Sequence, residues 1–438
     1  DAFLMCKGTT GIFVVASRIA GLAIGGASTI GIAENAFSVG LSAGWYDTAW
    51  AIGAVITAFL AVRYLRNSGY STISALVNEM YGKKTSFIMV ISMCIIQSGI
   101  IALQYKAGGS ILAALLPDVF TTESGTFFSF LIFMLVAMIG GMGSVSLTNV
   151  LNLILIYVGV IVATIIVLNN HGGWDAIQTL VAAEPDVPYL SFTEGMGWIG
   201  ILSWVIVMIG NTNSVQGVVQ IGLTGKDDRS AKWGYIIGAA FMVPVGFICA
   251  LLGVASKALL PDAVAAEALP QILMSIPPVL GGITLSGLWA ADMGTGCSMI
   301  VGLATTVSSD IVYRLPSSKK LESRKSFVNK LIVVLSSIVT YLIATQMGAI
   351  LSAMQQALSL AIGTSFIVIG ALIAPKFTSK KAGFCTILAS IVAIILWNFV
   401  PSLTGIFKSV GIFMVIVCGI VFVAISIFDK EKVNVKKA

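Results

Sequence analysis

Five ionisable side chains interrupt otherwise apolar stretches of the sequence: Arg18, Glu34, Asp47, Lys106 and Asp292. A charge surrounded by hydrocarbon costs about 2.5–3.5 kcal/mol on insertion scales, so each is a candidate for binding an ion or a charged ligand. Arg18 and Glu34 lie near the ends of their stretch, where a position at a membrane interface explains them. A lysine in apolar surroundings can bind a carboxylate or pair with Asp47, and the alternatives are a structural ion pair or an ammonium that reaches the interface.

The residues around Asp292 place small and hydroxyl-bearing side chains at helical spacing. Ala291, Gly294, Thr295 and Ser298 follow the i, i+3, i+4, i+7 pattern and therefore share one helix face. Such a face can complete an oxygen cage for a small cation if carbonyl groups of another helix meet it. Hydroxyls at this spacing can equally bond back to their own helix, and the sequence leaves both interpretations open.

Two apolar stretches contain polar, glycine-rich interruptions. The first is Ile24–Gly31 and the second is Gly210–Ser214, five apolar stretches later. Backbone carbonyls at such a break can bind a cation or a solute, and they are tolerated at membrane depth only where they line a cavity. Close helix packing is the alternative explanation for the glycines. The repeated spacing favours a cavity, because inverted-repeat transporters bind their solutes between broken helices at matching positions.

The composition indicates that these polar and charged residues lie on membrane-spanning helices. Hydrophobic residues make up 57% of the chain and charged residues 10%, with a mean hydropathy of +0.99, whereas a soluble domain has about 25% charged residues. We count twelve apolar runs of roughly the ~20 residues that cross a bilayer: 12–36, 43–65, 86–115, 125–143, 147–169, 196–221, 231–256, 280–309, 327–348, 353–375, 382–400 and 405–428. The sequence predicts an all-α polytopic membrane protein with twelve transmembrane helices in a single domain, residues 1–438.

The distribution of charge predicts the orientation. Most of the 25 Lys and Arg residues fall on the same side of the predicted membrane as the N-terminus, while Asp and Glu dominate the opposite loops. The positive-inside rule then places both ends of this multi-pass chain in the cytoplasm, at the cell membrane. The net charge of +6 reflects this orientation and does not imply a nucleic-acid partner. The six cysteines lack CxxC spacing, so neither a metal cluster nor a disulfide framework is expected.

Several stretches resemble the sodium:solute symporter family, whose members carry proline, pantothenate, sugars or sialic acid. They are Ile24–Ala33 leading into Gly40–Trp45, Leu65–Ile73 with Glu79–Gly82, Gly140–Val145 with Thr148 and Asn149, Gln220 with Lys226 and Asp227, and Ser308–Tyr313. The resemblance implies a leucine-transporter-like fold, with residues 12–169 and 196–375 as two inverted five-helix repeats and 382–428 as two extra C-terminal helices. Members usually have one more helix before the first repeat, so we expect this chain to lack an N-terminal helix.

The resemblance also implies a set of sodium ligands: Gly21, Ile24, Ala291, Gly294 and Thr295. A hydroxyl is usual where Gly294 stands, so water or Ser298 would have to compensate for its loss. A second sodium site in some members needs an aspartate where this chain has Asn149, so a second sodium ion is not expected.

For the solute, the resemblance points to two charged groups. Asp47 aligns with a solute contact of sugar-carrying members, and Lys106 lies in the span where a basic residue meets the carboxylate in sialic acid carriers. Further solute contacts are expected at Ser28, Trp204, Asn211, Asn213, Gln355 and Gln356. Together they predict a small organic carboxylate or a zwitterion whose amine faces Asp47, which would be an amino-acid-like, pantothenate-like or sialic-acid-like solute.

The function predicted is sodium-coupled symport by alternating access, with sodium as the bound and transported ion, the solute and the lipid bilayer as partners, and Asp292 as a coupling residue. One competing hypothesis is proton-coupled or cation-independent transport that uses Lys106 or Asp292. A hypothesis from another class is a transporter-like solute sensor, although only Asp429–Ala438 follows the last apolar run. An enzyme is not expected, because there is no HExxH motif and His171 is the only histidine. The oligomeric state is left open.

Overall fold

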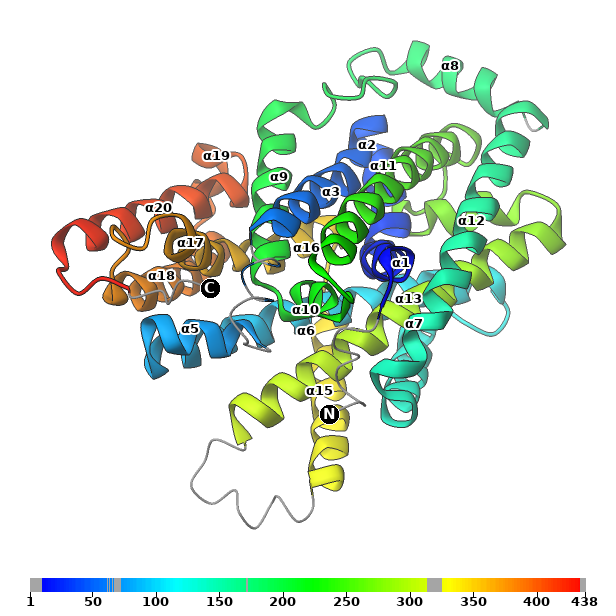
Figure 1. Cartoon of the computed structure of the whole chain (residues 1–438). Coiled ribbons are helices and arrows are strands. Elements are labelled where there is room, and N and C mark those ends of the chain that lie inside the picture. Colours follow the sequence, from blue (N-terminus) through cyan, green and yellow to red (C-terminus); the bar gives the residue numbers. More distant parts are fainter. Residues whose placement is uncertain are drawn as a thin grey trace.

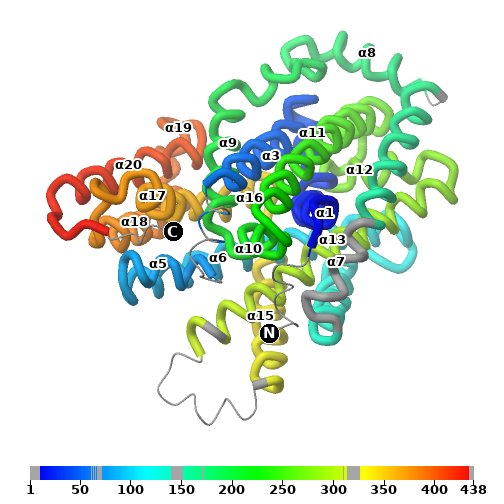
Figure 2. Tube along the Cα trace, in the orientation of Figure 1, coloured from blue at the N-terminus to red at the C-terminus, as the bar shows by residue number. Residues whose placement is uncertain are grey.

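The computed structural model describes residues 10–60, 62, 64, 66, 72–170, 172–312 and 325–433, and the side chains of 140–150, 170, 309 and 325 within these ranges are not described (Figure 2). His171 lies outside the described part, as do Leu65, residues 67–71 and Tyr313 of the predicted family stretches and the side chain of Asn149.

The described residues form helices joined by turns and loops, with no strand among them, which confirms the predicted all-α class. The elements are α1 (Ile12–Ala23), η1 (Ala27–Gly31), α2 (Ile32–Val39), η2 (Gly40–Gly44), α3 (Trp45–Phe59), α5 (Ile73–Tyr81), α6 (Lys83–Leu115), α7 (Thr122–Asn170), α8 (Gly173–Ala183), α9 (Gly197–Ser214), α10 (Gln216–Thr224), α11 (Asp228–Leu259), η3 (Ala265–Glu267), α12 (Ala268–Met274), α13 (Pro278–Asp310), α15 (Lys325–Ala344), α16 (Ile350–Ser359), α17 (Ala361–Ile373), α18 (Lys380–Phe399), α19 (Ser402–Phe407) and α20 (Val410–Phe428) (Figure 1).

Each predicted apolar run corresponds to a helix or helix pair. Nine helices of the described chain are long and apolar enough to cross a membrane, or up to 11 if each of two bent pairs forms one span. The first bent pair continues into α3, although 43–65 is predicted as a separate run. The single helix α7 contains two apolar windows, Thr122–Ile139 and Leu151–Asn169, which correspond to two predicted runs.

Both predicted breaks are present. The chain bends by 60° between α1 and the segment that begins at Ala27, and by 57° between α9 and α10. At the first break Ile24 leaves the helical conformation with ψ of 87°, and π-helix η1 follows after Gly26. A side chain on Gly26 would lie 2.3 Å from Ala107 Cβ and 2.8 Å from Asp292 Oδ1, so glycine is required for this close approach.

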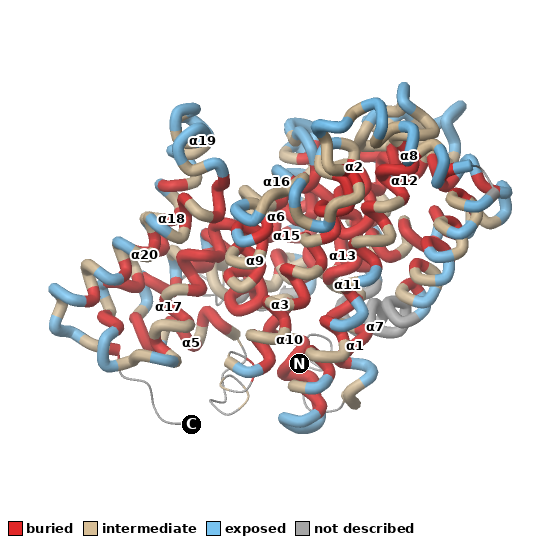
Figure 3. The backbone as a smooth tube through the Cα atoms, turned by 90° about the horizontal axis from the view of Figure 1, so that it is seen from above, coloured by how far each residue is buried: buried red, intermediate tan, exposed pale blue. Residues whose placement is uncertain are grey.

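The core lies where seven helices meet. α13 packs against α6 and α7, α3 packs against α9 and α11, and α1 lies along α11. The peripheral helices bury little of their apolar surface: the buried share of the apolar window is 22% in α15 and 67% in α6. Figure 3 shows this gradient from a buried centre to an exposed rim. Because those exposed faces are apolar, they suit a hydrocarbon environment.

Candidate functional site

Asp292 of α13 lies at the break in the first span. Its Oδ1 accepts a hydrogen bond of 3.1 Å from the Gly26 N–H, and Gln104 Oε1 of α6 accepts from the same N–H at 3.2 Å. The second oxygen, Oδ2, faces Gly108 of α6. The Asp292 side chain is fully buried, and its carboxylate binds the first free amide of the helix that restarts after the break. Helices far apart in sequence thus meet at this one backbone group.

The predicted sodium ligands are brought together in part. Thr295 Oγ1 of α13 donates to the Gly21 carbonyl of α1 at 3.2 Å, so the hydroxyl and carbonyl edges of the two helices are in direct contact. Ala291 and Gly294 are buried on the same helix face. Ser298, considered as compensation for the hydroxyl missing at Gly294, instead donates to the Gly294 carbonyl at 2.8 Å. The Ser298 hydroxyl therefore bonds back to its own helix, which is the alternative that the sequence left open for hydroxyls at this spacing.

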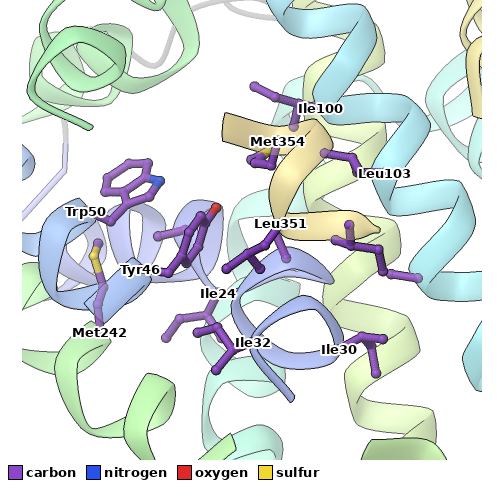
Figure 4. Close-up of a cluster of buried hydrophobic side chains, with 14 of the residues drawn as sticks. Ile24, Ile30, Ile32, Tyr46, Trp50, Ile100, Leu103, Met242, Leu351 and Met354 are labelled. Carbon is purple, nitrogen blue, oxygen red and sulfur yellow. The ribbon is translucent and has the colours of Figure 1, made fainter. Parts of the chain in front are cut away.

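A small cavity adjoins this contact. It measures about 20 Å³, which is room for a water molecule but not for an organic solute. Its lining comes from the break, from α3, α6, α9, α10 and α13, and from α16: Leu22, Ala23, Gly25, Ala27, Tyr46, Trp50, Ile100, Gln104, Asn211, Val218, Thr295, Met299 and Met354. Figure 4 shows Tyr46 and Trp50 on one side, with Ile100 and Met354 opposite. No charged side chain belongs to this described lining.

Sequence reasoning missed most of the lining. Of the predicted solute contacts only Asn211 reaches the cavity, and its Oδ1 has no hydrogen-bond partner among the described groups. Tyr46 and Trp50 were overlooked, although their i, i+4 spacing directly around Asp47 was a readable signal for a shared aromatic face. Gln104 was overlooked because its role depends on a backbone group 78 residues away.

Asp47 and Ser28 do not belong to this lining, although Ser28 bonds to Ala23, which does. Ser28 Oγ is 2.6 Å from the Ala23 carbonyl oxygen and 2.7 Å from Asp47 Oδ1. Asp47 is fully buried on α3 and faces Gly246 of α11, where a side chain would lie 3.1 Å from Asp47 Oδ2. The expected contact of these two residues with a solute is therefore not prepared in this conformation.

Lys106 does not lie at the cavity either. Its ammonium donates to the Met347 carbonyl at 2.8 Å and to the Gly348 carbonyl, in the segment that precedes α16. Glu34 of α2 accepts from the Ile350 N–H at 2.8 Å and so caps the beginning of α16. The ion pair with Asp47 that the sequence suggested is replaced by these backbone contacts, which join α2 and α6 to α16.

The other predicted solute residues support the site from outside the lining. Trp204 of α9 packs edge-on against Tyr46, with ring centroids 4.9 Å apart. Asn213 donates to the Ile209 carbonyl of its own helix at 2.9 Å. Gln355 donates to Ser203 Oγ at 3.1 Å, and Gln356 is half-buried one position further along α16.

A cluster of polar side chains lies beside the end of α2, where Lys257 donates to the Phe37 carbonyl. Lys257 donates to Glu184 at 3.2 Å and to the Tyr189 hydroxyl, and the Tyr189 carbonyl accepts from the Leu41 N–H at 2.8 Å. Glu184 follows α8 outside the spanning helices, and the hydrogen bonds from Tyr189 and Lys257 lower the pKa of its carboxyl. This cluster ties the segment after α8 to α11 and η2.

Known proteins resemble the chain in sequence and in fold. The sodium/glucose cotransporter of Vibrio parahaemolyticus is 24% identical over 389 residues, covering 81% of this chain and 70% of the relative. The sodium/proline symporter of Staphylococcus aureus is 22% identical over 339 residues, covering 72% of this chain and 64% of the relative, which is less than two thirds of its length.

Among solved structures, a sodium-coupled sialic acid symporter in a substrate-bound outward-open state superposes with a TM-score of 0.77 at 16% identity, covering 99% of this chain and 93% of that one. The inward-facing form of the transporter Mhp1 gives 0.62 at 14% identity, covering 96% and 91%. These likenesses establish the leucine-transporter-like fold.

The model of the sodium:solute symporter family matches residues 3–396, nearly the whole chain. The relatives are membrane transporters and not enzymes, as the sequence predicted. The chain belongs to the sodium:solute symporter family.

Proposed function

We propose that the chain uses a sodium gradient to carry a small organic solute across the membrane by alternating access. The contact between Thr295 Oγ1 and the Gly21 carbonyl carries this proposal. It places a hydroxyl oxygen and a carbonyl oxygen of two different helices side by side at the edge of a helix break, which is the arrangement that holds sodium ions in broken-helix transporters. We assign the Gly21, Ile24 and Ala291 carbonyls and the Thr295 hydroxyl as sodium ligands, with water in place of a hydroxyl at Gly294.

The cavity lining supports a zwitterionic solute of the amino-acid type. A lone carboxylate would enter a lining without a cationic side chain, because Lys106 is held by Met347 and Gly348. A zwitterion brings its own balancing charge, and its carboxylate can also pair with the bound sodium. Its amine can donate to Asn211 Oδ1, an acceptor of the lining that has no partner within the described chain. Tyr46, Trp50 and Met354 would then pack around its apolar part.

Contacts at both ends of the broken first span hold it against its neighbours. At one end Thr10 pairs with the segment after α10, through Thr10 N to Thr224 O at 3.1 Å and Lys226 N to Thr10 O at 2.9 Å. At the other end Lys106 and Glu34 hold the beginning of α16. Alternating access requires that these two groups of contacts open in turn, with sodium favouring the state that admits solute. We assign residues 12–169 and 196–375 as the repeats that move, and both ends of the chain as cytoplasmic.

The test is uptake into liposomes that contain the purified protein, with labelled proline, glucose and sialic acid offered separately. An inward sodium gradient is compared with an equal choline gradient at constant pH. We expect sodium to stimulate uptake of proline most, because it is the zwitterion of compact size. Uptake that is equal with sodium and choline but follows an imposed pH gradient would contradict sodium coupling and favour the competing proton-coupled hypothesis with Asp292.

A further inference from the structure

The Ser28 hydroxyl lies within hydrogen-bonding distance of two other oxygen atoms, and each of these two contacts requires a proton between the oxygens. The Ala23 carbonyl oxygen lies 2.6 Å from Ser28 Oγ, and Asp47 Oδ1 lies 2.7 Å from it. Both distances are those of short O–H···O hydrogen bonds, yet a serine hydroxyl has a single proton to donate. A carbonyl can only accept. The second proton must therefore belong to the Asp47 carboxyl.

The surroundings of Asp47 also favour a neutral carboxyl. The side chain is fully buried, and its Oδ2 has no hydrogen-bond partner within the described part of the chain. An unpaired carboxylate at such a position carries a large desolvation cost.

The described elements packed around Asp47 offer no adjacent positive charge. α9 and η2, which pack against α3, contain no ionisable side chain in Gly197–Ser214 or Gly40–Gly44. The ionisable neighbours that interact with Asp47 are Tyr46 on α3 itself, Tyr157 on α7 and Cys249 on α11. The nearest charged or ionisable groups beyond Cys249 on α11 are Tyr235 and Lys257, each about three helical turns from Gly246. Arg18 of α1 interacts with Tyr235.

We propose that Asp47 is a proton-binding site of the transport cycle, whose proton is donated to Ser28 while Ser28 donates to the Ala23 carbonyl. When the Asp47 proton leaves for the solvent on the open side, the Ser28 O–H must turn to the carboxylate. The Ala23 carbonyl then loses the Ser28 hydroxyl and keeps the Gly25 N–H at 3.1 Å, so one of its two lone pairs is freed. Because Ala23 borders the cavity, this lone pair becomes available to an electropositive occupant, and we assign that occupant as the sodium ion proposed above, with the Ala23 carbonyl as a further ligand. Proton and sodium thus compete at the break, a step that rests on the sodium coupling proposed above.

Infrared spectroscopy tests the proton without any solute. The wild type and Asp47→Asn are compared in sodium-free choline buffer at pH 7, with Asp262→Asn, an exposed loop carboxylate, as the matched control. The wild type minus Asp47→Asn difference should show the C=O stretch of a protonated carboxyl that shifts in heavy water, and the control difference should show only carboxylate bands. Carboxylate bands alone in the Asp47→Asn difference would overturn the proposal. If Asp47→Asn does not fold, Ser28→Ala should shift the same band, because the carboxyl O–H loses its acceptor, and an unshifted spectrum would overturn it.

Sodium titration by thermal shift tests the competition. One-for-one exchange predicts that the apparent sodium affinity of the wild type weakens about tenfold for each unit that the pH falls while Asp47 binds its proton, since linkage is reciprocal. Asp47→Asn should bind sodium with no such dependence. An equal dependence in both proteins would overturn the competition. Absence of any sodium effect while the infrared band is present would instead refute sodium coupling and leave the proton site standing.

Discussion

The two helix breaks have nearly the same bend, 60° and 57°, but they treat their polar groups in opposite ways. At the second break Thr212, Asn213 and Ser214 donate to Met208, Ile209 and Gly210 of their own helix, and Ser214 makes a longer contact of 3.3 Å with the Ala361 carbonyl of α17. At the first break the free amide of Gly26 is bound by Gln104 and Asp292, and the Gly21 carbonyl accepts from Thr295, all from other helices. The bend alone therefore does not make a site. A site arises where the freed backbone groups find partners on helices that can move apart.

The largest expected effect follows from the space at the two breaks. Gly26→Ala would put a methyl group 2.3 Å from Ala107 Cβ, and overpacking of this kind costs about 1–3 kcal/mol. The matched Gly217→Ala follows the second break, where its methyl group would meet Met299 Cε at 3.7 Å, an ordinary contact. We expect sodium-driven uptake to fall about tenfold or more for the first variant and to stay near wild type for the second. Equal loss in both would remove the difference between the breaks.

Removing the hydroxyl that meets the first break comes next. Thr295→Ala deletes an oxygen ligand of the proposed sodium ion, and a bond to a charged group contributes about 1.5–3 kcal/mol. We therefore expect sodium affinity, measured by thermal shift, to fall about tenfold, while Thr295→Ser restores it. Thr305→Ala is the matched control, because the Thr305 hydroxyl donates back to the Val301 carbonyl of its own helix at 2.7 Å. Unchanged affinity in Thr295→Ala would place the sodium site elsewhere.

A Lys106 variant tests whether contacts outside the cavity lining control transport through the first break. Lys106→Met keeps the apolar stem and removes the ammonium that holds Met347 and Gly348. Since this contact lies outside the cavity lining, we expect a lower melting temperature and a changed uptake rate, with sodium stimulation preserved. Lost sodium stimulation with unchanged solute affinity would make Lys106 a coupling residue instead, as the competing hypothesis holds.

The smallest effect should come from the second break. Thr212→Val keeps the shape of the side chain and deletes a bond that lies within its own helix. The expected cost is about 1 kcal/mol or less, with sodium affinity within about twofold of wild type in the same thermal-shift titration. A tenfold loss would show that the polar groups of the second break also serve the ion.

Much of the fold was predictable because its signals are local. The length and apolarity of each run predict a spanning helix, and clustered glycine and polar residues within a run predict the break. The first break lies within Ile24–Gly31 as predicted, whereas the second falls at Val215, directly after the predicted Gly210–Ser214, which remains helical. The rarity of charges at membrane depth likewise singled out Asp292, which the structure brings to the break.

The partners of individual side chains were decided by the tertiary structure. Asp292 and the Gly26 N–H are separated by 266 residues, and Lys106 and the Met347 carbonyl by 241. Whether Ser298 turns to its own helix or Thr295 to α1 depends on which face of α13 meets the break, and no local pattern specifies that. Local patterns in the sequence thus specify a membrane-spanning helical protein with two broken spans and charges at membrane depth, of which Asp47 and Asp292 are fully buried. Helix packing decided which polar groups meet, because hydrogen bonds act over about 3 Å and only the assembled helices bring their partners that close.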